Sequence, residues 1–460
     1  MSSEVMSDKL YWNEALETMF DETLFDLESK RLKTQISRIF QVNDFYRDKW
    51  QQAGVDLGDI QDLDDLHKLP FTEKTELADA QKTGALLGAN QSVELCKIMR
   101  IVGTGGTTGQ PLRLGLTKND LDAYSEMGAR ALWAMGCRPD DFVINCFNYS
   151  LYAGGTLDQS SFEKLGAAIL PYGVGNTNRL LQVMGSIKQD ICLYSTPSYA
   201  IHLAERAQEI GMSPQELNIT KGFFSGEAGL QVPDYRQKIE TTWGMSAADL
   251  YGAAEVGAQS GECEHRTGLH FFGQGLLVAE LINPKTLEVV AKTDGAIGEL
   301  VFTTLMYEAC PLIRFRTHDS VQVFTEPCTC GRTGFRFHTL GRSDDMFVVK
   351  GVNVFPSGVQ KALLSLQPQV TGEFYIVLNT VPPIDYSPLI CVEVSNEIDA
   401  SSHAGIIYVI KVAIREQLGF RAIIKLVKRG SIASMHKTRR LYRTYDGDRP
   451  PHENDSRCEE

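Results

Sequence analysis

The sequence predicts an α/β protein, with a large multi-layered N-terminal domain of mostly parallel sheets and a small α+β C-terminal domain. Three observations predict it. From Asn119 to His202, helical stretches alternate with short apolar strands, the pattern of crossover units in a parallel sheet. After Asp344, short strands and a helix extend over roughly the length of a small domain. A chain of 460 residues is also too long for one ordinary core.

Hydrophobic periodicity places the elements in order. Leu10 to Phe40 is expected to be helical, because apolar residues recur every three or four positions. Phe71-Thr72 is expected to begin another helix, with Glu73 and Glu76 as acids in its first turn. Strands are predicted at Leu95 to Val102, Leu112 to Leu116, Phe142 to Phe147, Ala168 to Pro171, Ile191 to Ser195, Phe347 to Lys350, Phe374 to Leu378, Leu389 to Val394 and Ala422 to Val427, with a helix at Ala404 to Gln417.

Composition and charge exclude several classes of protein. The chain is 43% apolar and has a formal net charge of −13. This charge argues against nucleic acid or an anionic membrane as the main partner, because both require a basic surface. No signal-peptide core and no membrane-spanning apolar run is present, so we expect a cytoplasmic protein. Its ten cysteines are expected to be reduced, as buried thiols or metal ligands.

A glycine-rich run, GTGGTTGQP, lies between two predicted strands at Gly103 to Pro111. Glycines let backbone N–H groups approach a polyphosphate, and the threonine hydroxyls add hydrogen-bond donors and a metal contact. The run is not a Walker A motif, because Gln110-Pro111 follows its last glycine. A phosphate-binding loop and a simple glycine-rich hairpin turn are both consistent with it.

Two later segments place small residues and an acid directly after an apolar strand. They are FFSGEAGL, Phe223 to Leu230, and ADLYGAAEVG, Ala248 to Gly257. Ligands of open α/β sheets bind at such carboxyl ends of strands. Further on, PLIRFRTHD, Pro311 to Asp319, is predicted as a strand that ends in an acid, and GRSDDMFVVKGVNVFP, Gly341 to Pro356, places a charged cluster between apolar strands.

The order of these segments resembles the adenylate-forming (ANL) superfamily and, within it, the phenylacetate-CoA ligase family of aryl-CoA ligases. The match extends from Tyr11-Trp12 through NDFYRDKW, Asn43 to Trp50, and LPFTEK, Leu69 to Lys74, to the C-terminal segment SIASMHKTRR. The resemblance implies the ANL fold. Residues 1–340 would be the adenylation domain, residues 341–445 a mobile C-terminal domain, and residues 446–460 a disordered tail.

The resemblance also implies an activity. An AMP-forming acid–thiol ligase would use ATP and Mg²⁺ to convert an aryl or arylacetic acid to an acyl-adenylate, then transfer the acyl group to coenzyme A. Two alternatives stay open: transfer to a carrier-protein thiol or an amine, and a degenerate nucleotide-binding homologue. Gln110 favours the last, because family members usually carry Lys or Arg there; Thr104-Gly105 replaces a serine pair, and His318 a glycine or arginine. A homodimer is among the expected states.

Residue roles follow from the same resemblance. Glu255 would bind Mg²⁺, Thr107 and Thr108 would hold the β- and γ-phosphates, Asp319 would bind the ribose hydroxyls, and Lys437 would be the catalytic lysine. The other nucleotide-binding residues would be Gly103, Thr104, Gly105, Gly106, Gly109, Ser225, Gly226, Glu227, Asp249, Tyr251, Gly252, Ala253, Ala254 and Arg342. The acid pocket would include Tyr149, Tyr152, Ala153 and Gly154, and the hinge would be Asp344. Alternatively, Lys437 is a solvated lysine of a basic tail, and Asp344 belongs to a charged turn bonded to Arg342.

A second group of residues indicates a metal. CEHRTGLH contains Cys263, His265 and His270, and CTCGR contains Cys328 and Cys330. A closed Zn²⁺ site needs four nitrogen or sulfur ligands, which two short ligand pairs can supply. Such a site would be structural, because it leaves no open coordination position. Which histidine binds stays undecided, and buried inert thiols are the alternative.

Overall fold

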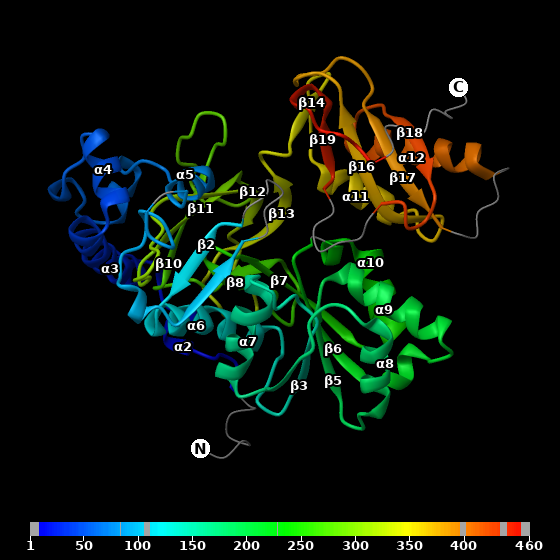
Figure 1. Cartoon of the computed structure of the whole chain (residues 1–460), viewed down its shortest axis with the longest axis horizontal. Coiled ribbons are helices and arrows are strands. Elements are labelled where there is room, and N and C mark those ends of the chain that lie inside the picture. Colours follow the sequence, from blue (N-terminus) through cyan, green and yellow to red (C-terminus); the bar gives the residue numbers. More distant parts are fainter. Residues whose placement is uncertain are drawn as a thin grey trace. The chain divides into compact units, whose positions relative to one another are not determined.

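The protein divides into two compact units. The computed structural model describes residues 9–82, 84–104, 111–227, 229–395, 402–432 and 439–451 (Figure 1). The large unit comprises Met1–Gln231 and Arg236–His338, and the small unit comprises Val232–Tyr235 and Thr339–Glu460. The boundary expected after residue 340 lies beside the change of unit at residues 338 and 339.

Helices and strands alternate through the first half of the chain and give way to strands in the second. The α-helices are α2 Glu14–Glu17, α3 Asp21–Val42, α4 Asp44–Gln52, α5 Lys74–Ala80, α6 Lys118–Ala134, α7 Ala153–Leu165, α8 Thr177–Ser186, α9 Pro197–Glu209, α10 Pro233–Trp243, α11 Pro356–Leu364 and α12 His403–Leu418. The strands are β1 Arg100–Gly103, β2 Arg113–Leu116, β3 Phe142–Asn145, β4 Ala168–Pro171, β5 Ile191–Ser195, β6 Ile219–Ser225, β7 Ser246–Ala253, β8 Gly257–Gly261, β9 Leu269–Phe271, β10 Leu277–Ile282, β11 Ile297–Thr304, β12 Phe315–Phe324, β13 Arg336–Arg342, β14 Phe347–Val349, β15 Val352–Val354, β16 Val370–Leu378, β17 Leu389–Val394, β18 Ile423–Val427 and β19 Leu441–Arg443.

The main sheet of the large unit is mixed. Within the described residues it has eleven strands in the order β10-β11-β12-β13-β9-β8-β7-β6-β5-β3-β4. The predicted parallel arrangement is confirmed for β3 to β7, with α6 and α7 on one side of these strands and α8 and α9 on the other (Figure 1). Beyond β7, the pairs β7–β8, β8–β9, β9–β13, β11–β12 and β10–β11 are antiparallel. The link from β7 to β8 is too short for a parallel crossover.

The stretch from Leu10 to Phe40 is largely helical, as expected, but it forms two helices, α2 and α3. The first ends at Glu17, with Thr18 as its C-cap. The carbonyl of Glu17 accepts a hydrogen bond of 3.0 Å from the backbone N–H of Thr333, so a distant loop takes an acceptor that a longer helix would have used. The second carries Leu32, Ile36 and Ile39, which are buried in a cluster with Tyr46 and Trp50 of α4.

Two strand predictions are also corrected. Leu95–Lys97 forms a 3₁₀ turn, so the strand expected from Leu95 begins only at Arg100. The strand expected from Pro311 begins at Phe315, because Arg314 adopts a left-handed backbone with φ 48°.

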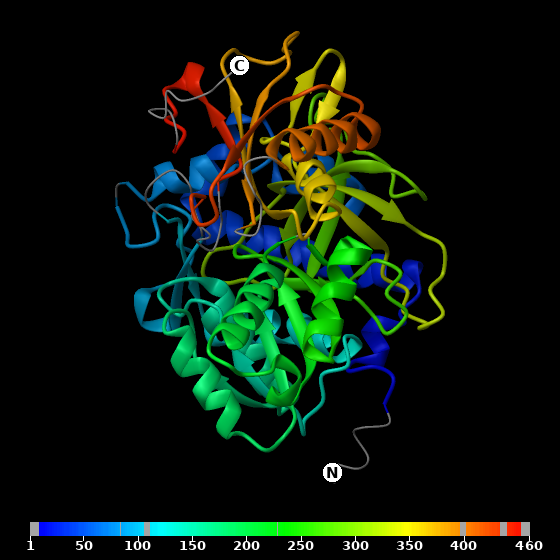
Figure 2. The same cartoon turned by 90° about the vertical axis from the view of Figure 1, so that its right-hand side faces the viewer.

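The small unit is an α+β domain. Its four-stranded sheet has the order β18-β17-β16-β19. Helices α11 and α12 lie side by side, as Figure 2 shows, and bury Val359, Leu363, Ile410 and Ile414 in one apolar cluster with the sheet. Strand β17 has the predicted bounds, and α12 extends one residue beyond its prediction at each end.

None of the helices in the described parts of the chain combines the length and apolar character required to cross a lipid bilayer.

Candidate active site

The glycine-rich run connects two paired strands. Gly103 of β1 is the partner of Arg113 of β2, and the backbone N–H of Thr104 donates to the carbonyl of Leu112 at 3.0 Å. Thr104 is buried, and its hydroxyl has no hydrogen-bond partner among the described residues. The remaining predicted loop residues, Gly105, Gly106, Thr107, Thr108 and Gly109, lie outside the described residues. The hairpin is therefore compatible with both interpretations of the run.

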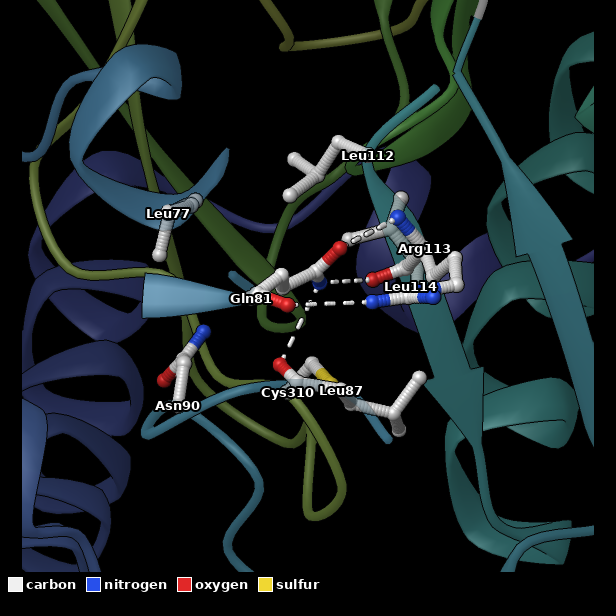
Figure 3. Close-up of a pocket in the computed structure, with 8 residues that line it drawn as sticks. All are labelled: Leu77, Gln81, Leu87, Asn90, Leu112, Arg113, Leu114 and Cys310. Atoms are coloured by element: carbon white, nitrogen blue, oxygen red, sulfur yellow. Dashed lines mark hydrogen bonds between the residues drawn. The ribbon is translucent and has the colours of Figure 1, made fainter. Parts of the chain in front are cut away.

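Gln81, directly after α5, anchors the base of this hairpin. Its side-chain amide donates to the carbonyl of Arg113 at 2.6 Å, and its side-chain oxygen accepts from the backbone N–H of Arg113 at 3.0 Å (Figure 3). A further bond of 3.2 Å reaches the carbonyl of Leu87. The Gln81 side chain thus satisfies both backbone groups of Arg113, as a neighbouring strand would, and fixes the position where β2 begins.

Glu255 lies in the turn between β7 and β8, and its side chain is only 8% exposed. It forms an ion pair of 2.8 Å with Lys74, the first residue of α5. The turn requires Gly252, because a Cβ there would approach the carbonyl oxygen of Gly257 to 2.7 Å. Leu114 to Leu116 of β2, together with Ala254 and Glu255, line one small cavity, so the hairpin and this turn are neighbours.

Tyr251 and Asp319 connect β7 to β12. The tyrosine hydroxyl donates to a carboxylate oxygen of Asp319 at 2.6 Å. His318 has φ 60°, a backbone conformation that favours glycine, and its ring lies 2.8 Å from a carboxylate oxygen of Glu73. That hydrogen bond lowers the pKa of Glu73. The strained backbone of His318 and the contact of its ring with Glu73 fix the conformation of the chain directly before Asp319.

Ser225 ends β6, which is parallel to β7, and Gly226 and Glu227 follow it. The Glu227 carboxylate accepts from the Ser198 hydroxyl at 2.6 Å and the Ser198 backbone N–H at 3.2 Å, at the start of α9. An acid at a helix N-terminus is stabilised by the helix dipole. Gly226 has φ 87°, so its backbone is in the conformation that glycine adopts without strain.

Asp249 is buried inside the protein at 4% exposure, so a direct contact with adenine has no support from its position. Its backbone N–H donates to the carboxylate of Glu262, which is paired with Arg236 at 2.7 Å. Burial, and next the negative charge of Glu262, raise the pKa of Asp249 to about 8. The side chain supports β7 from within, and its effect on the site is indirect.

The predicted acid pocket gathers around Phe147, which sequence reasoning missed. A Cβ at Gly154 would lie 3.2 Å from the Phe147 ring, and one at Gly226 would lie 3.8 Å from it. The Phe147 ring therefore lies between the predicted pocket and the predicted nucleotide segment. Tyr149 is half-buried, and Tyr152 pairs by an isolated bridge with Gly103 of the hairpin. Ala153 and Gly154 begin α7.

Beneath this region, Asp158 of α7 is buried. It accepts hydrogen bonds from Tyr194 at 2.5 Å and Tyr124 at 3.3 Å. Burial raises the pKa of Asp158 to about 7. The Tyr194 ring packs on Phe147 with 4.6 Å between ring centroids, so this polar network holds the aromatic wall of the pocket.

In the small unit, Arg342 and Asp344 form a bidentate ion pair of 2.9 and 2.6 Å. Arg443 donates to the backbone carbonyl of Asp344 at 2.5 Å. The charged turn considered for Asp344 is therefore present, and its hinge role stays a prediction. Lys437 lies outside the described residues.

The predicted metal ligands converge. The ligand atoms of Cys263, His270, Cys328 and Cys330 all lie within 4.8 Å of one another. His265 does not contribute, because its side chain is 41% exposed beside Glu264. The structure thus places His270 of β9, and not His265, beside the cysteines. The spacing in the sequence left the choice between the two histidines open.

These positions and the fold define an adenylate-forming enzyme of the ANL superfamily. Residues 351–445 match the family model of the AMP-binding enzyme C-terminal domain. The chain is 35% identical to phenylacetate-coenzyme A ligase of Thermus thermophilus over 378 residues, 81% of this chain and 82% of that protein. The Escherichia coli phenylacetate-coenzyme A ligase is 33% identical over 76% of this chain and 78% of its own length. The chain belongs to the phenylacetate-coenzyme A ligase family, whose members are AMP-forming acid–thiol ligases.

A solved structure agrees over nearly the whole chain. It is a 2-hydroxyisobutyryl-CoA ligase in the postadenylation state, with a TM-score of 0.87 and 30% identity over 95% of this chain and 93% of that one. The same ligase is also solved with an adenylate and CoA in the thioesterification state, with a TM-score of 0.70, 31% identity and the same coverage.

Proposed function

We propose that this protein uses ATP to convert an aryl or arylacetic acid to an acyl-adenylate and then transfers the acyl group to coenzyme A. The observation that carries the proposal is the pair of Tyr251 and Asp319, with Glu255 in the hairpin that follows Tyr251. Asp319 is a carboxylate suited to two ribose hydroxyls, and Glu255 is a carboxylate suited to a phosphate-bound cation. Both then lie near the end of β7.

In the first step, a carboxylate oxygen of the acid bonds to the α-phosphorus of ATP, and the bond from that phosphorus to pyrophosphate breaks. Negative charge grows on the phosphates, so positioned N–H donors stabilise the transition state more than the ground state. The buried hydroxyl of Thr104, at the start of the glycine-rich run, fits this task. Lys437 would add a positive charge at the reacting oxygens.

Glu255 fits Mg²⁺, because a hard cation prefers carboxylate oxygens. The ion would neutralise phosphate charge. In the described chain the Glu255 carboxylate is paired with Lys74, which fixes its orientation. Lys74 is thus a positioning residue that sequence reasoning missed, although it ends the LPFTEK segment that carries the family resemblance.

In the second step, the sulfur of coenzyme A bonds to the acyl carbonyl carbon, the bond from that carbon to AMP breaks, and the thiol proton passes to solvent. The related ligase is solved in a postadenylation and a thioesterification state, which supports two arrangements for the two steps. We assign the change between them to rotation about Asp344.

The acid is proposed to be aromatic because Phe147 and Tyr149 lie beside the start of α7, where Gly154 and Gly155 leave little room. A Cβ at Gly155 would approach the carbonyl oxygen of Asn148 to 2.4 Å. Flat rings pack against one another in offset or edge-on arrangements, and such pairs gain about 0.5–1.5 kcal/mol beyond area burial.

Acid-dependent pyrophosphate release tests the proposal, with phenylacetate, benzoate, 2-hydroxyisobutyrate and acetate, each with and without coenzyme A. We expect release with the aryl acids and an acyl-CoA product only when coenzyme A is present. Release without a thioester product would favour a carrier-protein or amine acceptor. No release with any acid, from protein that binds ATP, would favour the degenerate homologue.

A further inference from the structure

Three cysteines and one histidine of the large unit form a compact group that the ligase chemistry does not use. The Sγ atoms of Cys263 and Cys328 are 3.7 Å apart, and Sγ of Cys330 is 3.6 Å from Nε2 of His270. A tetrahedral Zn²⁺ site, with Zn–S near 2.3 Å and Zn–N near 2.0–2.1 Å, has S···S edges of about 3.8 Å and S···N edges of about 3.5 Å. These two separations therefore match edges of a zinc tetrahedron, and all four ligand atoms lie within 4.8 Å of one another.

The fold supplies these ligands from neighbouring strands. Cys263 follows β8, His270 is the central residue of β9, and the loop between β12 and β13 carries the other two cysteines. Strand β13 pairs antiparallel with β9, with Arg336 opposite His270. The two ligand pairs are thus held facing each other by the sheet, before any metal binds.

The loop has the turn that a metal-binding cysteine pair needs. The backbone N–H of Gly331 donates to the carbonyl of Cys328 at 3.0 Å, and Gly331 has φ 80°. A Cβ at Gly331 would approach the Tyr11 hydroxyl to 2.3 Å, so only glycine fits. The Thr267 hydroxyl lies 3.3 Å from Sγ of Cys328, which provides a polar neighbour for a coordinated sulfur.

Buried inert thiols do not account for this group as well. Four other buried cysteines pack within apolar clusters, as inert thiols do: Cys137, Cys192, Cys310 and Cys391. In contrast, the four clustered side chains face one another, and the almost fully buried His270 places its Nε2 beside Sγ of Cys330.

The same loop also holds the N-terminal segment. The Tyr11 hydroxyl donates to the carbonyl of Cys330 at 3.0 Å. Arg332 forms a buried ion pair of 2.8 Å with Glu17, and it donates to the carbonyl of Leu10 at 2.9 Å. A metal that fixes the loop would therefore fix residues 10–17, although none of them is a ligand.

We propose that Cys263, His270, Cys328 and Cys330 bind one structural Zn²⁺ ion, which fastens the N-terminal segment to the sheet. Four protein ligands leave no position for substrate, so the ion has no part in the ligase chemistry. The proposal does not depend on the proposed function.

Elemental analysis of the full-length protein, expressed with zinc supplied, is the first test. We expect about one zinc per chain, and the same protein refilled with Co²⁺ should show the absorption bands of a tetrahedral cobalt–thiolate site. Absence of zinc, or another metal in its place, would overturn the assignment.

Two matched variants locate the ligands. His270→Asn is expected to lose the metal, and His265→Asn, in the same segment but exposed, is expected to keep it. Retention of full zinc content by folded His270→Asn would contradict the site. If that variant does not fold, the cobalt spectrum of the unaltered protein decides. Bands from thiolate and imidazole ligands would support the site, and their absence would contradict it.

Hydrogen exchange tests the fastening role. Removal of zinc by a chelator should accelerate amide exchange at least tenfold over residues 10–17 and the 326–334 loop, with little change in the small unit. Unchanged exchange over residues 10–17 in zinc-free protein would overturn this role.

Discussion

At the scale of single residues, sequence order predicted the site segments, but it did not predict the side chains that contact them. Lys74 and Phe147 act on the site through residues distant in the chain, namely Glu255 and Gly226. Such contacts depend on how strands are placed side by side, which periodicity does not specify. His270 was distinguished from His265 by its position beside the cysteines, which the pairing of β9 with β13 sets, and by the exposure of His265.

Lys437→Ala is predicted to abolish adenylation while leaving ATP binding and melting temperature unchanged. A contact made only in the transition state affects kcat rather than ground-state affinity. Pyrophosphate release measured beside thermal melting and ATP titration tests this, with exposed Lys428→Ala as control. Undiminished release by the folded variant would remove Lys437 from the mechanism.

Asp249→Asn is predicted to change the pH dependence of stability and to leave the KM for ATP within about threefold, a difference of under 1 kcal/mol. The pKa of this buried carboxyl is raised to about 8, so the folded state holds its proton more tightly than the unfolded chain. Its stabilising contribution is therefore complete below about pH 4 and is lost as pH rises towards 8, by up to ~1.4 kcal/mol per pH unit.

Melting temperatures between pH 5 and 8.5 test this. The decline in melting temperature with rising pH should be shallower for Asp249→Asn than for the unaltered protein, and the exposed control Asp190→Asn should show the ordinary decline. A large rise in KM for ATP would instead restore the expected adenine contact.

At the scale of elements, strands were predicted best where apolar runs end at clear turn residues, and β4, β5 and β17 have the predicted bounds. Boundaries failed where tertiary contacts or backbone strain intervene. Thr333 takes the acceptor that ends α2, and the left-handed Arg314 delays the start of β12. Neither cause is visible in hydrophobic periodicity.

Gln81→Ala is predicted to loosen the β1–β2 hairpin. It removes two hydrogen bonds to the Arg113 backbone and one to Leu87, each contributing about 1 kcal/mol. We expect a loss of about 2–3 kcal/mol in the free energy of unfolding and weaker ATP binding. Urea unfolding and ATP titration measure both, with exposed Gln61→Ala as control. An unchanged ATP affinity in the destabilised variant would show that Gln81 supports the fold alone.

At the scale of the whole molecule, regular alternation predicted the parallel half of the main sheet, and the run of short strands after β7 was not recognised as its antiparallel continuation. Their short apolar segments and turns are compatible with several sheet arrangements, so pairing is decided by long-range packing. The second, smaller domain was predicted because strands and a helix extend after Asp344 over roughly the length of a small domain.

Asp344→Pro is predicted to impair thioester formation more than adenylation. Proline fixes φ near −65° and removes an N–H, so a residue that must change conformation between steps loses that freedom. Single-turnover measurement of both half-reactions tests this, with Asp344→Ala as control for loss of the Arg342 ion pair. Equal impairment of both steps in a stably folded Asp344→Pro protein would place the hinge elsewhere.

The central claim is that one chain adenylates an acid and then transfers it to coenzyme A. Its most direct test is a single-turnover experiment in which enzyme, ATP, Mg²⁺ and phenylacetate are mixed, and coenzyme A is added afterwards. We predict one equivalent of pyrophosphate and an enzyme-bound acyl-adenylate before the addition, and conversion of that adenylate to acyl-CoA and AMP after it. Thioester formation without a prior adenylate, or an adenylate that coenzyme A does not consume, would contradict the account.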